Sequence, residues 1–218
     1  NCHFHGPTID PLGDYSIAQP VAITGIGNDG TAPALNVSLL NNHLHDLSKP
    51  IVFLCAGARR IEGNNIHDFF HDAIKTSWCV GAGLATVSDN ECVGIIAKDT
   101  DAGGPHPDFI QFVGIGATAD WNVDVSRNRL IDCYARAWAQ GIFMADMPTG
   151  FMYVGKVNDN LIWSKGGATT GIMNGHAKDF EVIGNIISGC TLSQATLPGI
   201  RVGETQRAGN QVIKNNIA

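Results

Sequence analysis

The sequence predicts an all-β fold, a parallel β-helix, in which one structural unit repeats along the chain as a coil of the helix. In each unit an Asn has an apolar residue three positions before it and another two positions after it. Successive Asn residues lie roughly 20–40 positions apart, and an irregular spacing of this size is typical of stacked repeats. The members of this Asn row are Asn42, Asn64, Asn90, Asn128, Asn160, Asn185 and Asn215.

A second row of residues supports the same fold. Short segments centred on an Ile, several of them preceded by Gly, alternate with the Asn residues. No single unit could bury its apolar face alone, so the units must stack and equivalent residues must lie side by side. An irregular β-sandwich with Asn residues in its turns is the alternative. The members of the Ile row are Ile51, Ile74, Ile110, Ile142, Ile172 and Ile200.

Asn suits a tight bend because it tolerates the left-handed backbone region and its amide can bond to the backbone. Stacked Asn side chains could also hydrogen-bond to one another between coils. We therefore expect the residues from Asn64 to Asn215 to lie in one line at a bend. The apolar residues two positions after them should form one buried column, which consists of Ile66, Cys92, Leu130, Ile162 and Ile187.

Along the chain, residues 1–34 are interpreted as an irregular N-terminal segment or a partial coil, with one strand near residues 21–24. Residues 35–218 are interpreted as the β-helix, with about six or seven coils. Residues 96–109 are a large insertion, and residues 114–126 and 145–156 form further loops. The chain begins without Met and stops in mid-coil without a polar cap, so we expect a segment of a longer polypeptide.

Composition excludes some partners and leaves others open. Only 16% of the residues are charged and the net charge is −6, which indicates no nucleic-acid partner. No apolar run has the length of a membrane span, and we expect no signal peptide within these residues. The six Cys residues contain no Cys-x-x-Cys pair. Cys92, Cys133 and Cys190 are predicted to be buried thiols, whereas the disulfide state of Cys2, Cys55 and Cys79 stays open.

The first candidate catalytic group lies two positions before the Ile row. Asp72 and Asp108 occupy equivalent positions on adjacent coils, so about 4.8 Å, the spacing of neighbouring strands, should separate them. Such a pair can share a proton, bind a cation or act as acid and base. His71 and His106 flank the pair. A polar turn column is the alternative interpretation.

A second candidate group lies four positions after the Ile row, where Asp146, His176 and Glu204 fall on consecutive coils. Asp146 and Glu204 would be about 9.6 Å apart, which is two strand spacings. That distance is near the upper end of the carboxylate separation in inverting glycosidases. A surface rim with incidental charges is the alternative.

Candidate glycan-binding residues follow the same rows. Lys75 and Gln111 come one position after their Ile residues. Arg201, in the same position, could pair with a sugar carboxylate or sulfate. Trp78 and Trp121 lie near loops, where an indole could stack on a sugar.

We expect no metal centre. Asp99 and Asp101 match two positions of a calcium loop, but the side-chain ligand at position five and the closing Glu are missing. A solvated turn is therefore favoured over calcium there. The stretch from His67 to His71 has Asp where a zinc-protease helix requires Glu.

Residues 35–218 resemble the right-handed parallel β-helix superfamily of pectate lyases, polygalacturonases, alginate-modifying enzymes and phage tailspikes. The resemblance rests on the Asn row, the Gly-Ile row and the stretch His106-Pro107-Asp108-Phe109-Ile110-Gln111. It implies a right-handed solenoid and a polysaccharide partner, but no particular activity, because this fold hosts many functions.

The favoured function is a glycan-binding β-helix of a phage or phage-like tail fibre or tailspike that recognises a host surface polysaccharide. We expect an extracellular or virion location, and a homotrimer or larger tail assembly as a further option. The glycan should bind across residues 72–75 and 106–111. A polysaccharide hydrolase, lyase or epimerase on the same scaffold is one alternative, and a structural spacer is another.

Overall fold

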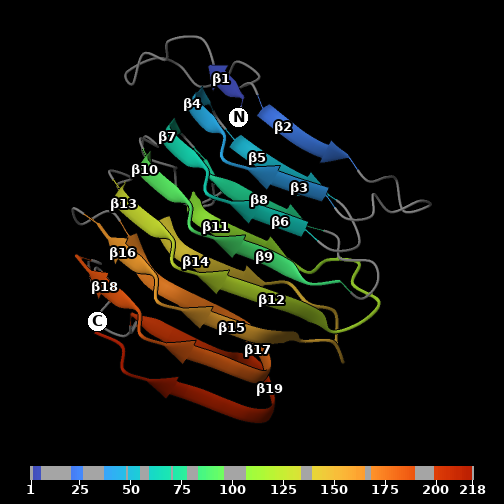
Figure 1. Ribbon diagram of the computed structural model, residues 1–218. Coiled ribbons are helices and arrows are strands. Elements are labelled where there is room, and N and C mark those ends of the chain that lie inside the picture. The colour runs from blue at the N-terminus through green and yellow to red at the C-terminus, as the bar shows by residue number, and fades with distance from the viewer. Residues whose placement is uncertain are drawn as a thin grey trace.

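The computed structural model describes residues 2–5, 21–26, 37–47, 49–54, 59–69, 71–77, 83–95, 107–133, 139–164, 168–189 and 199–217. These residues form an all-β structure whose strands pair in parallel and stack from the N-terminal to the C-terminal end (Figure 1). Among them there is no helix. The prediction of an all-β fold with stacked parallel strands is therefore confirmed, and the arrangement is compatible with a parallel β-helix.

One wall is a seven-stranded sheet in which every third strand from β1 to β16 pairs with the next, and β16 then pairs with β18. Its strands, in spatial order, are β1 (His3–His5), β4 (His43–Leu47), β7 (Asn65–Phe69), β10 (Glu91–Ile95), β13 (Arg129–Cys133), β16 (Leu161–Trp163) and β18 (Ile186–Ser188).

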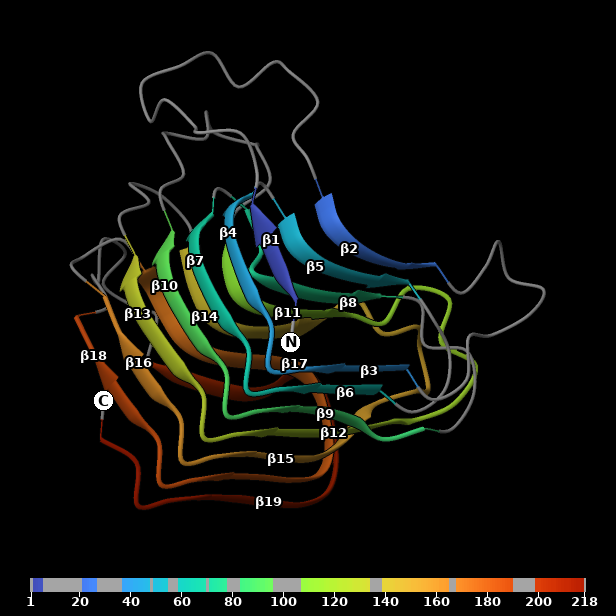
Figure 2. The same cartoon turned by 45° about the horizontal axis from the view of Figure 1, so that its top comes forward.

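The other strands form a curled sheet with two walls. The first wall has β2 (Val21–Ile26), β5 (Lys49–Leu54), β8 (Ile74–Ser77), β11 (Asp108–Val113) and β14 (Ala139–Ala145). The second has β3 (Val37–Leu40), β6 (Arg59–Glu62), β9 (Ala85–Ser88), β12 (Trp121–Ser126) and β15 (Tyr153–Asn158). The long strand β17 (Ala168–Ile183) pairs with both β14 and β15, and β19 (Ile200–Lys214) pairs with β17, so these two bent strands join the walls (Figure 2).

An Asn ladder lies at the bend between the second wall and the seven-stranded sheet. From Asn64 onward, each Asn oxygen accepts two hydrogen bonds from the Asn of the preceding coil, one from its backbone N–H and one from its Nδ2, at 2.9–3.1 Å. The oxygen of Asn42 accepts from the Cys2 N–H at 3.0 Å. From Asn64 onward, the Nδ2 also donates to a backbone carbonyl of the preceding coil. The predicted stacking of Asn side chains is confirmed. The ladder consists of Asn42, Asn64, Asn90, Asn128, Asn160, Asn185 and Asn216.

Two details of the Asn prediction are wrong. The ladder residue does not adopt the left-handed conformation; the residue before it does, with φ between 56° at Asn41 and 71° at Gly184. At the last coil that left-handed position is Asn215, with φ 56°, and Asn216 is the ladder member. Asn suits both positions, so the sequence pattern of two consecutive Asn residues assigned the ladder position to Asn215, one residue too early.

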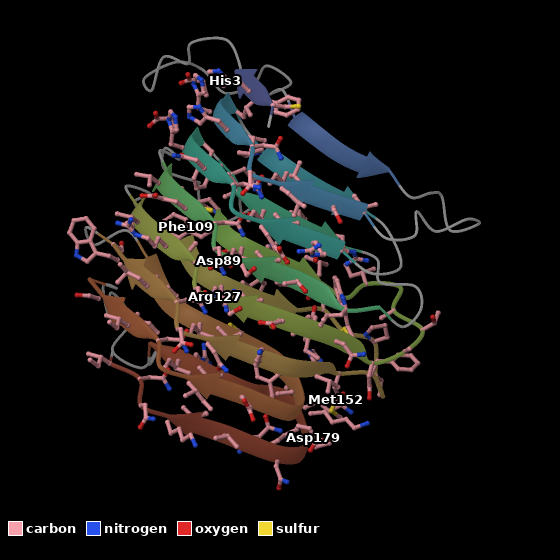
Figure 3. The ribbon with its side chains drawn as sticks, viewed as in Figure 1. His3, Asp89, Phe109, Arg127, Met152 and Asp179 are labelled. Atoms are coloured by element: carbon pink, nitrogen blue, oxygen red, sulfur yellow. The ribbon has the colours of Figure 1, made fainter. Side chains whose placement is uncertain are left out.

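The left-handed residues also interact between coils. Arg127 donates from Nε and from one terminal nitrogen to the two oxygens of Asp89, both at 2.8 Å, and both residues have φ near 56°. Figure 3 shows this pair on the outer side of the bend.

The Ile row and the apolar column are confirmed. The row residues pair with one another from Ile51 to Ile200, and those from Ile51 to Ile172 are fully buried. The column residues also pair in register and are buried from Ile66 to Ile187. Because both sets point inward, they form the core between the walls.

The cysteine predictions are tested in part. Cys92 is a buried free thiol, and burial raises its pKa. Cys2 is free and exposed. The side chain of Cys133, together with Cys55, Cys79 and Cys190, lies outside the described residues.

Replacement of Asn128 by Ala should lower the free energy of unfolding by about 3 kcal/mol or more, because each buried group that loses its hydrogen-bond partner costs about 1–3 kcal/mol. Asn128 accepts two hydrogen bonds from Asn90 and donates to Asn160 and to the Val87 carbonyl. Urea unfolding measures the loss. The exposed Asn122→Ala is the control and should stay within about 0.5 kcal/mol of the parent. Similar losses in both variants would contradict a stabilising ladder.

Candidate functional site

The structure brings together the two carboxylates of the first predicted catalytic group. Asp72 lies two residues before β8 and Asp108 begins the neighbouring strand β11, and the Asp108 N–H donates to Asp72 Oδ1 at 3.1 Å. Both side chains are completely shielded from solvent. The predicted proximity of the pair is therefore confirmed, but both carboxylates lie in the interior.

The surroundings of Asp72 favour its charged form. His71 Nδ1 lies 3.0 Å from Asp72 Oδ2, and Lys75 Nζ lies 3.5 Å from the same oxygen. The Asp72 N–H also lies 2.9 Å from His71 Nδ1, which can accept this bond only while it carries no proton; a proton on Nδ1 would instead be donated to Asp72 Oδ2. Burial alone raises the pKa of Asp72, but its contacts with His71, Lys75 and the Asp108 N–H outweigh burial and hold the pKa below its usual range.

The second carboxylate has a mostly buried partner. Gln111 Nε2 donates to Asp108 Oδ2 at 3.0 Å, and the Gln111 side chain is itself buried. Lys75 is the more accessible member of this group, with a quarter of its side chain exposed. This cluster of side chains links the chain at β8 to β11, and its burial leaves little access for a large ligand. Catalysis by Asp72 and Asp108 stays a prediction.

The second predicted group is only partly assembled. Asp146 is exposed, and its charge raises the pKa of His176, although burial of the ring is the larger effect and leaves the pKa lowered. The strand partner of His176 is Gln206, because the register shifts after the pairing of Asn174 with Val202. Glu204 therefore does not continue the column, contrary to the prediction; its side chain lies outside the described residues.

Trp121 is not a sugar-stacking residue, which corrects the sequence prediction. Its side chain is fully buried and packs against Phe112 and Tyr153, with ring centroids 5.4 and 5.7 Å away. The Arg59 guanidinium lies over the indole at 4.7 Å. Core packing thus explains Trp121. Arg201 is half-buried on β19, and its strand partner is Met173.

Several predicted residues lie outside the described part of the chain. These are Trp78, His106, Asp99 and Asp101. Their roles in glycan binding, catalysis and calcium binding remain predictions.

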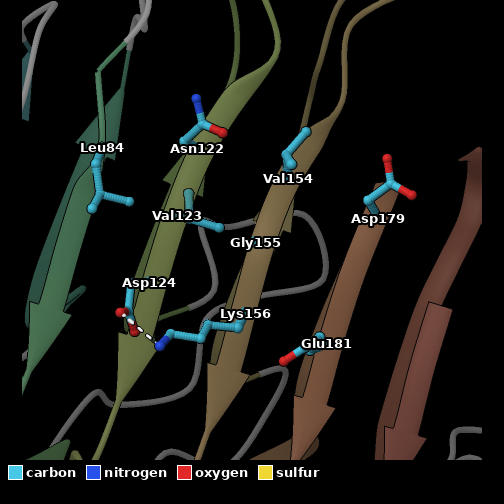
Figure 4. A pocket seen from close by; sticks show the side chains of 9 residues that line it. All are labelled: Leu84, Asn122, Val123, Asp124, Val154, Gly155, Lys156, Asp179 and Glu181. Carbon is cyan, nitrogen blue, oxygen red and sulfur yellow. Dashed lines mark ion pairs between the residues drawn. The ribbon is translucent and has the colours of Figure 1, made fainter. Parts of the chain in front are cut away.

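An open groove crosses the outer face of the second wall, over strands β9, β12, β15 and β17 (Figure 4). Its volume is about 360 Å³. It is lined by Leu84, Asn122, Val123, Asp124, Val154, Gly155, Lys156, Asp179 and Glu181.

Strand pairing aligns the charged side chains of the groove. Asp124, Lys156 and Glu181 are direct partners on three adjacent strands, so their charges alternate along one row. Lys156 Nζ lies 3.2 Å from Asp124 Oδ2. Because outward side chains on adjacent strands repeat at about 4.8 Å, this row presents polar groups at regular intervals.

The floor of the groove requires glycine. Gly155 has φ 129°, and a Cβ built on it would lie 2.0 Å from the Val123 carbonyl oxygen. A register shift beside Gly155 leaves Asp179 without a strand partner, with φ 44° and an exposed side chain. This irregularity adds a second carboxylate from β17 to the groove beside Glu181.

Sequence reasoning missed the groove because it followed the inward-pointing rows. A usable signal was present in residues 121–126, where Asn122 and Asp124 alternate with apolar residues. This alternation predicts that Asn122 and Asp124 point outward. The alignment of Asp124 with Lys156 and Glu181 cannot be predicted in the same way, because it depends on the exact strand register, including the shift at Gly155.

Comparisons with protein-family models, with curated proteins and with solved structures found no match. Within the described residues, no helix combines the length and the apolar character that crossing a membrane requires.

Stability in acid should depend on Asp72. Its pKa is lower in the folded chain than in the unfolded chain, so the folded form gains stability above the unfolded pKa and loses it as the pH falls through the folded pKa. As the pH falls below about 4, the parent should therefore lose stability more steeply than Asp72→Asn. Urea unfolding over this pH range tests the difference. The exposed Asp146→Asn is the control and should follow the parent; equal acid dependence in the parent and Asp72→Asn would refute the assignment.

Proposed function

We propose that this chain is a right-handed parallel β-helix of the pectate-lyase-like kind, with about six or seven coils, and that it binds glycans. In this proposal it serves as part of a phage or phage-like tail fibre or tailspike, recognises a host surface polysaccharide, and acts on the virion or outside the cell. The observation that carries the proposal is the groove with its row Asp124–Lys156–Glu181.

The chemistry of the groove suits a hydroxyl-rich chain. Asn122, Asp179 and Glu181 are exposed and offer amide and carboxylate groups that can hydrogen-bond to sugar hydroxyls. Leu84 and Val154 add apolar surface, against which the C–H face of a sugar ring can pack. The groove is open and crosses several strands, so it can bind an internal segment of an extended polymer and does not require a chain end.

Charge narrows the class of glycan. The lining contains three carboxylates, from Asp124, Asp179 and Glu181, and one ammonium group, from Lys156. A polyanionic glycan would meet an excess of negative charge there. We therefore propose a neutral or amino-sugar polysaccharide as the ligand, in preference to a polyuronate.

The enzyme alternative has a separate basis. Asp72 and Asp108 form the close acid pair that a polysaccharide hydrolase, lyase or epimerase would use, with Lys75 and Gln111 beside them. The burial of both carboxylates favours binding over catalysis as the main function. The spacer alternative needs no ligand at either place.

The double variant Asn122→Ala/Glu181→Gln should weaken binding to neutral polysaccharides by roughly 5–140-fold, because each of the two lost polar contacts is worth about 0.5–1.5 kcal/mol. Glycan-array screening of the parent selects the ligand, and calorimetry measures the affinity. The matched control, Asn65→Ala/Glu91→Gln, makes the same chemical changes on the outer face of the seven-stranded sheet and should bind like the parent. No neutral or amino-sugar ligand for the parent, or equal loss in both double variants, would overturn the groove assignment.

Release of reducing ends or unsaturated products from the bound polysaccharide separates adhesin from enzyme. We expect no release by the parent. If the parent does cleave and Asp72→Asn/Asp108→Asn abolishes cleavage while binding is retained, the enzyme alternative replaces the adhesin. If neither the parent nor any variant binds or cleaves a polysaccharide, the spacer alternative replaces both the adhesin and the enzyme.

A further inference from the structure

A cluster of four histidines lies on the outer face of the seven-stranded sheet, at its N-terminal end. His3 is on β1, His43 and His45 are on β4, and His67 is on β7. Strand pairing aligns His3 with His43 and His45 with His67. The intervening residue Leu44 points into the core, so the four rings share the outer face, where Figure 3 places His3.

The ring nitrogens converge in two short pairs. His3 Nε2 lies 2.7 Å from His45 Nε2, and His43 Nε2 lies 2.7 Å from His67 Nε2. Ligand nitrogens of His3, His43 and His45 all lie within 4.8 Å of one another. At 2.7 Å two imidazole nitrogens cannot both carry a proton, so at least one lone pair of each pair points at the other ring.

Two carboxylates contact the cluster at the Nδ1 atoms of His45 and His67 and orient these rings. Asp46 Oδ2 lies 2.7 Å from His45 Nδ1, and Asp68 Oδ2 lies 2.8 Å from His67 Nδ1. Both Asp residues have a left-handed backbone, with φ 55° and 54°. A carboxylate that accepts the Nδ1 proton of a neutral imidazole leaves Nε2 with its lone pair, which is the arrangement that supports histidine ligands of metal ions.

We propose that His3, His43 and His45, with His67 as the fourth donor, bind one divalent transition-metal ion, of which Zn²⁺ is the best match. Four imidazoles and no oxygen ligand favour zinc-class ions over Ca²⁺ or Mg²⁺. Tetrahedral Zn–N bonds of about 2.0–2.1 Å place the nitrogens about 3.3 Å apart. Each 2.7 Å pair therefore needs to open by about 0.6 Å, and the wider separations among His3, His43 and His45, which reach up to 4.8 Å, need to close by up to about 1.5 Å. Rotation of the imidazole rings about their side-chain bonds supplies movements of this size.

The ion would clamp three consecutive strands. β1 has three residues and is the edge of the seven-stranded sheet, with β4 as its neighbour. A metal ion bound by His3, His43 and His67 joins β1, β4 and β7 through side chains as well as backbone. A site with four protein donors has no open position for substrate, so the ion stabilises the structure and does not catalyse a reaction. This inference is independent of glycan binding.

The test uses the full chain without an affinity tag, stripped of metal with EDTA and titrated with Zn²⁺ against a chromophoric chelator. One ion per chain should bind with high affinity and raise the thermal unfolding temperature. Co²⁺ in its place should give the absorption bands of a tetrahedral site. His43→Gln/His45→Gln should abolish this binding and the temperature shift. His176→Gln, a histidine outside the cluster, should change neither.

A milder pair of variants keeps the ligands in place. Asp46→Asn/Asp68→Asn should weaken Zn²⁺ affinity by roughly 10–100-fold, the usual effect of removing an outer partner. Loose binding of several ions with equal affinity in the parent and the double His variant would overturn the proposal. The proposal would also be overturned if the parent bound no Zn²⁺, or if the parent and both double variants bound Zn²⁺ with equal affinity.

Discussion

The hydrogen bonds of the Asn ladder set the register of the structure at one bend. Each buried amide both accepts from the coil before and donates to the coil after it, so a coil displaced by one residue would leave several buried polar groups without partners. The left-handed residue in front of each ladder Asn turns the chain from the second wall into the seven-stranded sheet. Strands that leave this bend in either direction are thereby aligned, which is why outward side chains also form rows, Asp124–Lys156–Glu181 on one wall and His45–His67 on the other.

Departures from the regular pairing coincide with both candidate sites. Asp46 and Asp68 adopt a left-handed conformation inside strands of the seven-stranded sheet, and this brings each carboxylate against the histidine before it. Asp179 is left without a strand partner beside Gly155, and its side chain joins the groove. The register shift at Asp179 resembles a β-bulge, which redirects a side chain at the expense of hydrogen bonds between strands. The repeat supplies the scaffold, and its irregular residues supply much of the chemistry.

The inward rows could be predicted from sequence because burial constrains them at every coil. The Ile row and the column from Ile66 to Ile187 are correct for that reason. The prediction slipped where two residues met the same requirement, at Asn215 and Asn216, and where a register shift intervenes, before Glu204. The adjacency of Asp72 and Asp108 followed from the rows, but their burial did not, because burial depends on packing that spacing does not report. The groove and the histidine cluster lie on outer faces, where no apolar periodicity marks them.

The two candidate sites occupy different walls and different coils, and this separation has a functional consequence. Groove strands β9, β12 and β15 lead into the ladder residues Asn90, Asn128 and Asn160, whereas the histidine-bearing strands β4 and β7 follow Asn42 and Asn64. An ion at the histidines would therefore leave the groove open. It would act instead on the seven-stranded sheet, where it would join the three-residue strand β1 to β4 and β7. The ladder fixes register only between neighbouring coils, so an ion bound by side chains of β1, β4 and β7 would add a connection between these three strands beyond their backbone pairing.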